Sequence, residues 1–110
     1  MKQGEIWRAN LNPSKGSEQS GFRPVVIVSG NLLNENLPIV IVVPLTTKIK
    51  RYKGNPILQP DRVNGLKNES EMLIFHIRSI SKDRLIEKLG IIEMDQLDRS
   101  TKTLNDLLKY

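Results

Sequence analysis

Short apolar segments alternate with polar, glycine-containing loops along most of the chain. Residues 4–11 alternate between apolar and polar side chains, which predicts a strand with one buried face. The runs 24–29 and 38–45 are apolar and largely β-branched, as is typical of strands that are covered on both faces. Residues 55–59 predict a short strand, and residues 70–80 predict a longer one. In the longer strand we expect one face to carry Leu73, Phe75 and Ile77, and the other to carry Ile74, His76, Arg78 and Ile80.

Weaker signals mark the connections and the C-terminal part of the chain. Residues 30–36 favour a connector with one helical turn, and Ser81 is placed to cap a short helical turn over 81–85. Residues 87–92 predict a last strand. From residue 93 onward apolar side chains recur at helical spacing, which predicts an amphipathic helix of about four turns against the sheet. The stripe on this helix comprises Leu97, Thr101, Leu104, Leu107 and Leu108.

The order of these elements predicts the fold class. The strands are short and joined by polar loops, and they lack the intervening helices that parallel pairing requires. We therefore expect a mainly β fold with α content, in which a small twisted antiparallel sheet or open barrel packs against one C-terminal helix. A length of 110 residues favours a single domain over 1–110.

Composition disfavours several kinds of site and favours a polyanionic partner. The chain has no cysteine, which excludes disulfides and thiolate metal sites, and its single histidine argues against a histidine-rich metal site. No apolar run approaches the ~20 residues of a membrane span, and no apolar signal core follows Met1, so we expect a cytoplasmic protein. The net charge of +5 and the pI of about 9.7 suit a polyanion, and they equally suit an acidic protein.

A polar loop over 16–24 carries the first group of candidate chemical residues. Glycines at both ends of its polar part permit backbone angles that are closed to other residues. Between them lie a carboxylate, an amide and two hydroxyls, and Arg23 follows, with its backbone restricted by Pro24. Loops on a rigid scaffold often carry function, but a solvated hairpin loop is the simpler interpretation from these residues alone.

Several motifs in this sequence resemble those of the MazF/PemK/Kid family of bacterial toxins. The opening stretch reads GEIWRANLNPSKGSEQSGFRPVVIVS. It matches a G-[DE]-[IV]-[WY] strand, an N-P-x-x-G-x-E-Q loop, and an R-P step into a β-branched strand. Two further matches are VVPLTT, at the end of the third predicted strand, and the block FHIRSISKDRL. With the C-terminal helix, these motifs cover nearly the whole chain.

The resemblance implies a fold, an activity and partners. The implied fold is a small SH3-like open barrel of the CcdB/MazF type with a C-terminal helix, acting as a homodimer. The implied activity is sequence-specific cleavage of single-stranded RNA without metal or cofactor, which leaves a 2′,3′-cyclic phosphate and a 5′-hydroxyl. The implied protein partner is an acidic antitoxin whose partly disordered segment occupies the RNA groove.

The resemblance also implies roles for individual residues. Metal-free cleavage needs a base for the 2′-hydroxyl, an acid for the leaving oxygen and a cation for the phosphorane oxygens. Arg23 matches the R-P arginine, whose guanidinium can give two hydrogen bonds to phosphate; an ion pair with Glu18 is the alternative. Thr46 matches the family threonine and is expected to hydrogen-bond the scissile phosphate, with Thr47 as its substitute if the register shifts by one. Glu18 is a candidate base, and Gln19 is expected to contact RNA.

One departure from the family pattern concerns catalysis. Many members carry an acidic residue followed by glutamine before the I-R step, where this chain has Phe75 and His76. In the Kid branch that acid and an arginine two residues earlier supply base and acid, and the arginine position here is Leu73. We therefore expect catalysis to depend on the three residues Arg23, Thr46 and Glu18. His76 is an alternative acid–base group, because histidine ordinarily titrates near neutral pH.

A second polar loop, after the third predicted strand, is strongly basic. Its cations favour contact with the RNA backbone, and its tyrosine is available to stack on a base. A solvated charged loop is the simpler alternative. The residues expected to bind RNA are Gln19, Thr47, Lys48, Lys50, Arg51, Tyr52, Lys53, His76 and Arg78.

Two other functions are compatible with the sequence. The CcdB gyrase poisons share this kind of fold and bind a protein target, but the R-P and P-L-T motifs favour an enzyme that binds phosphate. The other alternative is a basic RNA-binding module that has lost catalysis, because the family's acid is missing at the Phe75–His76 step.

Overall fold

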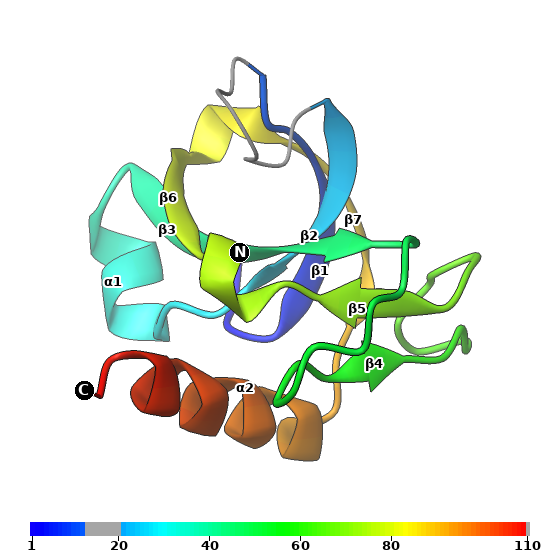
Figure 1. The fold of residues 1–110 in the computed structure, drawn as a ribbon. Coiled ribbons are helices and arrows are strands. Elements are labelled where there is room, and N and C mark those ends of the chain that lie inside the picture. The colour runs from blue at the N-terminus through cyan, green and yellow to red at the C-terminus, as the bar shows by residue number, and fades with distance from the viewer. Residues whose placement is uncertain (13–20, 110) are drawn as a thin grey trace.

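The strands form an antiparallel sheet that rolls into a half-barrel, and a long C-terminal helix lies beside it (Figure 1). The computed structural model describes residues 1–12 and 21–109. The strand order is β4-β5-β3-β2-β1-β7, and β6 also pairs with β3. The elements are β1 (Glu5–Asn10), β2 (Phe22–Ile27), α1 (Asn31–Asn36), β3 (Ile39–Thr46), β4 (Ile57–Leu58), β5 (Ser70–Met72), the 3₁₀ turn η1 (Ile74–His76), β6 (Arg78–Ser81), the 3₁₀ turn η2 (Lys82–Arg84), β7 (Leu85–Ile91) and α2 (Met94–Leu107).

This arrangement confirms the predicted mainly β fold with one C-terminal helix. The strand pairings that the structure describes are all antiparallel. The strands predicted over 24–29, 38–45 and 87–92 begin within two residues of β2, β3 and β7. The short turn before β7 is also as predicted, because the Ser81 hydroxyl accepts a hydrogen bond from the Asp83 backbone N–H at 3.4 Å.

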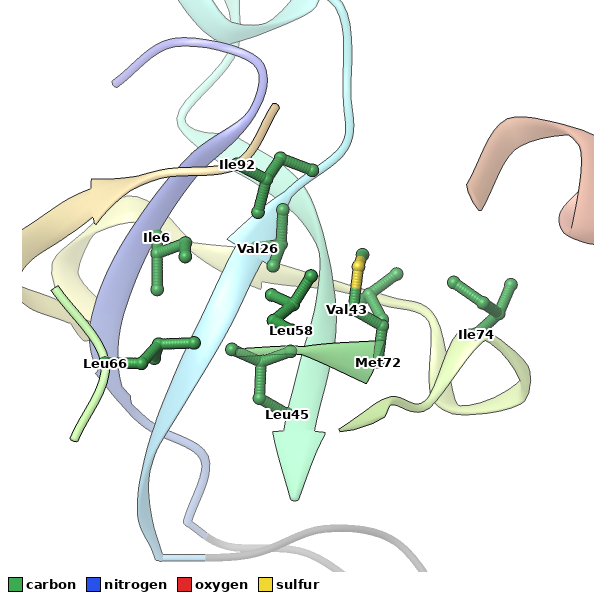
Figure 2. Packing of buried hydrophobic residues seen from close by; sticks show 9 residues of the cluster. All are labelled: Ile6, Val26, Val43, Leu45, Leu58, Leu66, Met72, Ile74 and Ile92. Atoms are coloured by element: carbon green, nitrogen blue, oxygen red, sulfur yellow. The ribbon is translucent and has the colours of Figure 1, made fainter. Parts of the chain in front are cut away.

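Two apolar clusters cover opposite faces of the sheet. Successive side chains of a strand point to opposite faces, so β3 contributes Val40 and Val42 to one cluster and Val43 and Leu45 to the other. This double burial explains why β2 and β3 are apolar at nearly every position. The outer core consists of Ile6, Val26, Val43, Leu45, Leu58, Leu66, Met72, Ile74 and Ile92 (Figure 2). The inner core consists of Ala9, Leu11, Val25, Ile27, Val40, Val42, Ile80 and Leu85.

The prediction of a single buried face for the first strand is wrong. Ile6 is fully buried in the outer core, while Ala9 is fully buried in the inner core. The strand resembled an amphipathic one because it also carries Arg8. This residue forms an exposed ion pair with Glu87 of β7, with an Nε–Oε1 distance of 3.2 Å.

Helix α2 packs on the outer core through Leu97 and Leu104. Its start is closed by the Glu93 backbone N–H, which donates to the Gln96 side chain at 2.9 Å. The prediction that the whole stripe faces the sheet is wrong for Thr101, Leu107 and Leu108, because these three side chains are exposed. Neither of the helices within residues 1–12 and 21–109 is long and apolar enough to cross a membrane.

The continuous strand predicted over 70–80 is also wrong. Leu45 pairs with Met72 and Val42 pairs with Arg78, so five residues on one chain segment face only two on β3. The surplus is taken up by η1, at the point where Pro44 has no N–H to continue the ladder. As a result the expected alternation of faces fails here: Leu73 and Ile74 are both buried, and Phe75 is exposed.

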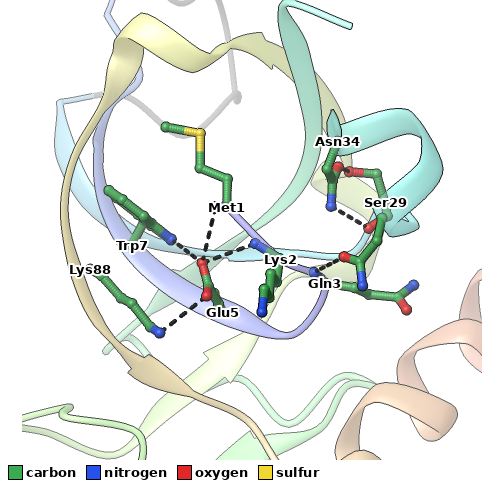
Figure 3. Close-up of polar contacts among 9 residues, drawn as sticks. Met1, Lys2, Gln3, Glu5, Trp7, Ser29, Asn34 and Lys88 are labelled. Atoms are coloured by element: carbon green, nitrogen blue, oxygen red, sulfur yellow. Dashed lines mark hydrogen bonds and ion pairs between the residues drawn. The ribbon is translucent and has the colours of Figure 1, made fainter. Parts of the chain in front are cut away.

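A buried carboxylate ties the N-terminus to the sheet at the side of β1 and β7. Figure 3 shows Glu5 receiving hydrogen bonds from the Trp7 indole at 2.9 Å and from the Lys2 backbone N–H at 3.0 Å. The Lys88 ammonium lies 3.1 Å from its other oxygen. Burial raises the pKa of Glu5, but the hydrogen bonds from Trp7, Lys2 and Lys88 outweigh burial and lower that pKa to about 2.

Candidate functional site

The ends of two neighbouring strands bring the predicted catalytic residues to the same edge of the sheet. The β2–β3 ladder includes the pair Val25 and Pro44. Arg23 lies two residues before Val25, and Thr46 lies two residues after Pro44. In antiparallel strands these offsets run toward the same edge, and side chains two residues apart share a face. Arg23 and Thr46 therefore lie at the same edge and on the face of the sheet that bears the inner core.

Two clefts border the end of β3, and consecutive threonines line different ones. The arginine cleft has a volume of about 340 Å³ and is lined by Gly21, Phe22, Arg23, Pro24, Leu45, Thr47 and Ser70. The aromatic cleft has a volume of about 510 Å³ and is lined by Thr46, Lys48, Lys50, Tyr52, Leu73, Phe75 and His76. Thr47 thus lines the same cleft as Arg23, and Thr46 lines the other cleft.

The two threonines differ in exposure and in hydrogen bonding. Thr46 is buried, and its hydroxyl oxygen accepts a hydrogen bond from the Lys48 backbone N–H at 3.1 Å. A hydroxyl has one hydrogen to donate in addition to its acceptor sites, so Thr46 keeps a donor for a bound phosphate. Thr47 is exposed in the arginine cleft.

An aromatic group forms one wall of the aromatic cleft. The rings of Tyr52 and Phe75 meet edge to face, with centroids 5.2 Å apart and planes at 87°. The rings of Phe75 and His76 are 4.7 Å apart and tilted by 47°. Apolar and aromatic ring faces next to lysines suit a stacked base with its phosphate. Sequence reasoning placed Phe75 on a strand face with Leu73 and Ile77 and noted that the family's acid is missing there, but it did not anticipate the exposed ring next to Tyr52.

The predicted positions of His76 and Arg78 on one strand face are wrong. His76 belongs to η1 and lines the aromatic cleft. Arg78 belongs to β6, where it pairs with Val42 and is half-buried. The two residues thus belong to different elements, and His76 lines the same cleft as Thr46.

Glu71 anchors the basic loop, which we define as residues 48–53. Its carboxylate is fully buried and accepts hydrogen bonds from the backbone N–H groups of Lys50 and Arg51, both at 2.8 Å, and of Tyr52 at 3.0 Å. The Asn55 side-chain amide donates a fourth, at 3.0 Å. Burial raises the pKa of Glu71, but the hydrogen bonds from Asn55 and the three backbone groups outweigh it and lower the pKa below its usual range.

Sequence reasoning missed Glu71, although a signal was present. Glu71 directly precedes the apolar run Met72–Ile74, and a carboxylate at a buried strand position must be hydrogen-bonded. The donors that satisfy it come from about twenty residues earlier in the chain, and no local pattern relates the two segments.

Two other cations of the basic loop are placed outside both clefts. Lys53 lines a separate cleft of about 520 Å³ with Arg99 and Lys102 of α2. Arg51 is exposed and has a left-handed backbone, with φ of 58°. The structure therefore gathers Lys48, Lys50 and Tyr52 but does not bring all the expected RNA-binding residues together.

Glu18 and Gln19 lie outside the described residues. The ends of the segment that contains them are paired at the edge of the arginine cleft. The Leu11 backbone N–H donates to the Gly21 carbonyl oxygen, and the Gly21 backbone N–H donates to Asn12 Oδ1, both at 2.9 Å. Arg84 donates from its guanidinium to the carbonyl oxygens of Asn10 and Asn12.

Among the residues that the structure describes, no group of His, Cys, Asp and Glu side chains is arranged to hold a metal ion.

Comparison with known proteins gives one consistent result. Residues 2–108 match the model of a family described as PemK-like, MazF-like toxin of type II toxin-antitoxin system. The chain is 33% identical to Endoribonuclease MazF9 of Mycobacterium tuberculosis, with 97% of this chain and 98% of the relative covered. It is 34% identical to Endoribonuclease MazF of Staphylococcus saprophyticus, with 98% and 88% covered.

Solved structures agree with the sequence matches. A crystal structure of MazF from Deinococcus radiodurans superposes with a TM-score of 0.85 at 28% identity, covering 98% of this chain and 96% of that one. A MazE-MazF crystal structure from the same organism superposes with a TM-score of 0.77 at 27% identity, covering 98% and 95%.

Proposed function

This chain belongs to the PemK-like, MazF-like toxins of type II toxin–antitoxin systems, and we propose that it is a sequence-specific endoribonuclease that cleaves single-stranded RNA. The relatives named above are endoribonucleases. The observation that carries the proposal is that the ends of β2 and β3 place Arg23, Thr46 and Thr47 along two neighbouring clefts, beside lysines and an aromatic wall. That combination suits a phosphodiester and its flanking bases.

The proposed reaction is transesterification by the neighbouring 2′-hydroxyl, without a metal. The 2′-oxygen bonds to phosphorus as the bond from phosphorus to the 5′-oxygen breaks, so the products are a 2′,3′-cyclic phosphate and a 5′-hydroxyl. A base on the protein takes the proton of the 2′-hydroxyl, and the leaving 5′-oxygen takes a proton from Arg23 or from solvent water. Arg23 stabilises the negative charge on the phosphorane oxygens, and Thr46 donates its hydroxyl hydrogen to one of them.

Two groups are candidates for the proton taken from the 2′-hydroxyl. Glu18 is the carboxylate of the family's loop motif. His76 lines the same cleft as Thr46, so both residues would face the same segment of bound RNA. The pH–rate profiles of wild type and His76→Ala distinguish the two candidates. A dependence on one group near neutral pH that disappears in His76→Ala assigns the base to His76. A profile that is the same in both proteins assigns it to Glu18.

The proposal includes a homodimer, an acidic antitoxin and action on mRNA in the cytoplasm. The net charge of +5 and the lysines of the aromatic cleft suit an acidic segment as well as RNA. A structural relative was solved as a MazE-MazF assembly. Light scattering tests the dimer, and competition between an acidic peptide and labelled RNA tests whether both bind the same face.

One assay tests the proposed activity. Purified protein is incubated in EDTA with a single-stranded RNA transcript of mixed sequence, and the ends of the products are analysed. We expect cuts at a defined sequence, 2′,3′-cyclic phosphate ends and loss of cleavage in Arg23→Ala. Tight RNA binding without cleavage would instead support an inactive RNA-binding module. Absence of both, together with inhibition of gyrase, would support a CcdB-like poison.

A further inference from the structure

We propose that Glu71 is a positioning residue for RNA recognition: its buried carboxylate holds the basic loop in the conformation that forms the aromatic cleft. The inference rests on the proposed endoribonuclease function and adds a residue that contacts no RNA itself. Glu71 pairs with Thr46 across β3 and β5, so the residue that anchors the loop sits beside the strand end that carries the predicted catalytic hydroxyl.

The hydrogen bonds to Glu71 come from consecutive residues of the loop. Lys50 and Arg51 donate backbone N–H groups to one carboxylate oxygen, and Tyr52 donates to the other. Successive N–H groups that converge in this way form an anion-binding nest, and here the anion is part of the chain. Because the carboxylate is fully buried, its charge depends on these hydrogen bonds and on the one from Asn55.

The conformation that the nest requires is not one the loop favours alone. Arg51 has φ of 58°, in the left-handed region that is unfavourable for a residue with a side chain. The loop also places several like charges close together in sequence, and these repel one another. Both effects favour other conformations, and the hydrogen bonds to Glu71 offset them.

Asn55 connects the anchored loop to the turn that carries Phe75. Its amide nitrogen donates to Glu71, and its carbonyl oxygen accepts from the Ile74 backbone N–H at 3.4 Å. Its own backbone N–H donates to the Tyr52 carbonyl at 3.1 Å. The loop and η1 are thus held against a common group, which keeps Tyr52 and Phe75 close enough for their rings to be in contact.

The test replaces Glu71 by glutamine and uses a second buried glutamate as control. Glu71→Gln keeps the size of the side chain but turns one acceptor into a donor that faces N–H groups. Glu5→Gln makes the same change in a carboxylate that is also buried and hydrogen-bonded, on the β1–β7 side and outside both clefts. Both variants are compared with wild type in an RNA oligonucleotide assay, after the cut site has been mapped on a transcript.

We expect Glu71→Gln to raise KM for the oligonucleotide about tenfold, which corresponds to about 1.4 kcal/mol of binding, while kcat changes little. Amide hydrogen exchange at residues 50–52 should become fast while exchange in β2 and β3 stays slow. Glu5→Gln should leave KM unchanged even if it lowers the melting temperature as much. A purely structural role for Glu71 predicts equal effects of both variants on KM.

Two results overturn the proposal: slow exchange at residues 50–52 in Glu71→Gln, or fast exchange there with KM unchanged. If Glu71→Gln does not fold, Asn55→Ala removes one donor and the connection to η1, and its KM should rise by a smaller factor; an unchanged KM in that variant counts against the proposal. A wild-type protein that neither cuts nor binds the transcript counts against the proposed function, and exchange at residues 50–52 still decides whether Glu71 holds the loop.

Discussion

The two clefts beside the end of β3 are built from different kinds of structure. The arginine cleft takes Arg23 and Pro24 from a strand whose pairing with β1 includes both residues. The aromatic cleft takes its lysines and Tyr52 from an irregular loop, and Phe75 and His76 from a 3₁₀ turn. The residues proposed to contact the reacting phosphate, Arg23 and Thr46, thus lie on strands, while the lysines and aromatic rings proposed to bind flanking RNA lie on a loop and a turn that a buried side chain connects.

This difference suggests a division of labour. Substitutions of Arg23 and Thr46 should act mainly on kcat, because they remove interactions made with the charge that develops on phosphate. Substitutions of the lysines and aromatic rings of the aromatic cleft should act mainly on KM and on RNA affinity, because stacking and backbone contacts exist before the reaction begins.

The largest effect is expected from Arg23. Arg23→Ala should lower kcat about 10²- to 10³-fold, the loss typical of removing a donor to a developing oxyanion. Arg23→Lys retains the charge but not the planar fork, so it should recover part of the activity. Single-turnover cleavage at saturating RNA measures both variants. A normal kcat in Arg23→Ala would remove the arginine cleft from the chemistry.

Acid should destabilise the protein through Glu5, which lies outside both clefts. Its pKa is lowered to about 2 in the folded protein from an ordinary value of 4.5, so the stabilisation is fully present above pH 4.5 and is lost as the pH falls toward 2. The shift corresponds to about 3 kcal/mol. Urea unfolding between pH 7 and pH 3, followed by Trp7 fluorescence, should give a shallower pH dependence for Glu5→Gln. Equal slopes in the two proteins contradict this expectation.

Comparing the two threonines shows which hydroxyl contacts the reacting phosphate. Thr46→Val removes a hydroxyl at nearly constant volume and should lower kcat about ten- to hundredfold, as expected for a hydrogen bond to a charged group. Thr46→Ser keeps the hydroxyl and should retain activity. Thr47→Val should have little effect on kcat. The reverse order of the two valine variants would transfer the role to Thr47, which shares the arginine cleft with Arg23.

Tyr52 should affect binding rather than catalysis. Tyr52→Ala removes a ring that contacts Phe75 and should weaken RNA binding about tenfold, within the range measured for a base stacked on an aromatic side chain. Tyr52→Phe keeps the ring and serves as the matched control. Fluorescence anisotropy with labelled oligonucleotide gives both affinities, and equal affinities for Tyr52→Ala and Tyr52→Phe would exclude stacking.

The smallest effect is expected from the two lysines of the aromatic cleft. If Lys48 and Lys50 each contact one phosphate, the double alanine variant should reduce the slope of log K against log salt by about 1.4, since each contact on single-stranded RNA contributes about 0.7. The double variant Lys82→Ala and Lys88→Ala removes the same charge outside both clefts. Equal slopes for the two double variants would mean that the lysines act only through net charge.

Much of the fold was predictable because its signals are local. The runs over 24–29 and 38–45 could be assigned as strands from their β-branched residues, and the C-terminal helix from its periodicity. The motifs around Arg23 and Thr46 also identified the family, which the comparisons confirm. These features are each specified within a short stretch of sequence.

Tertiary structure decided what local patterns do not encode. The break in the strand over 70–80 follows from a register difference between the two segments that pair with β3. The exposed Phe75 ring follows from that break, and the conformation of the basic loop follows from Glu71, about twenty residues further along. Sequence alone therefore determined the strands, the helix and the residue types at the site. Which of those residues share a cleft was decided by long-range pairing and by one buried carboxylate, because neither depends on neighbours in sequence.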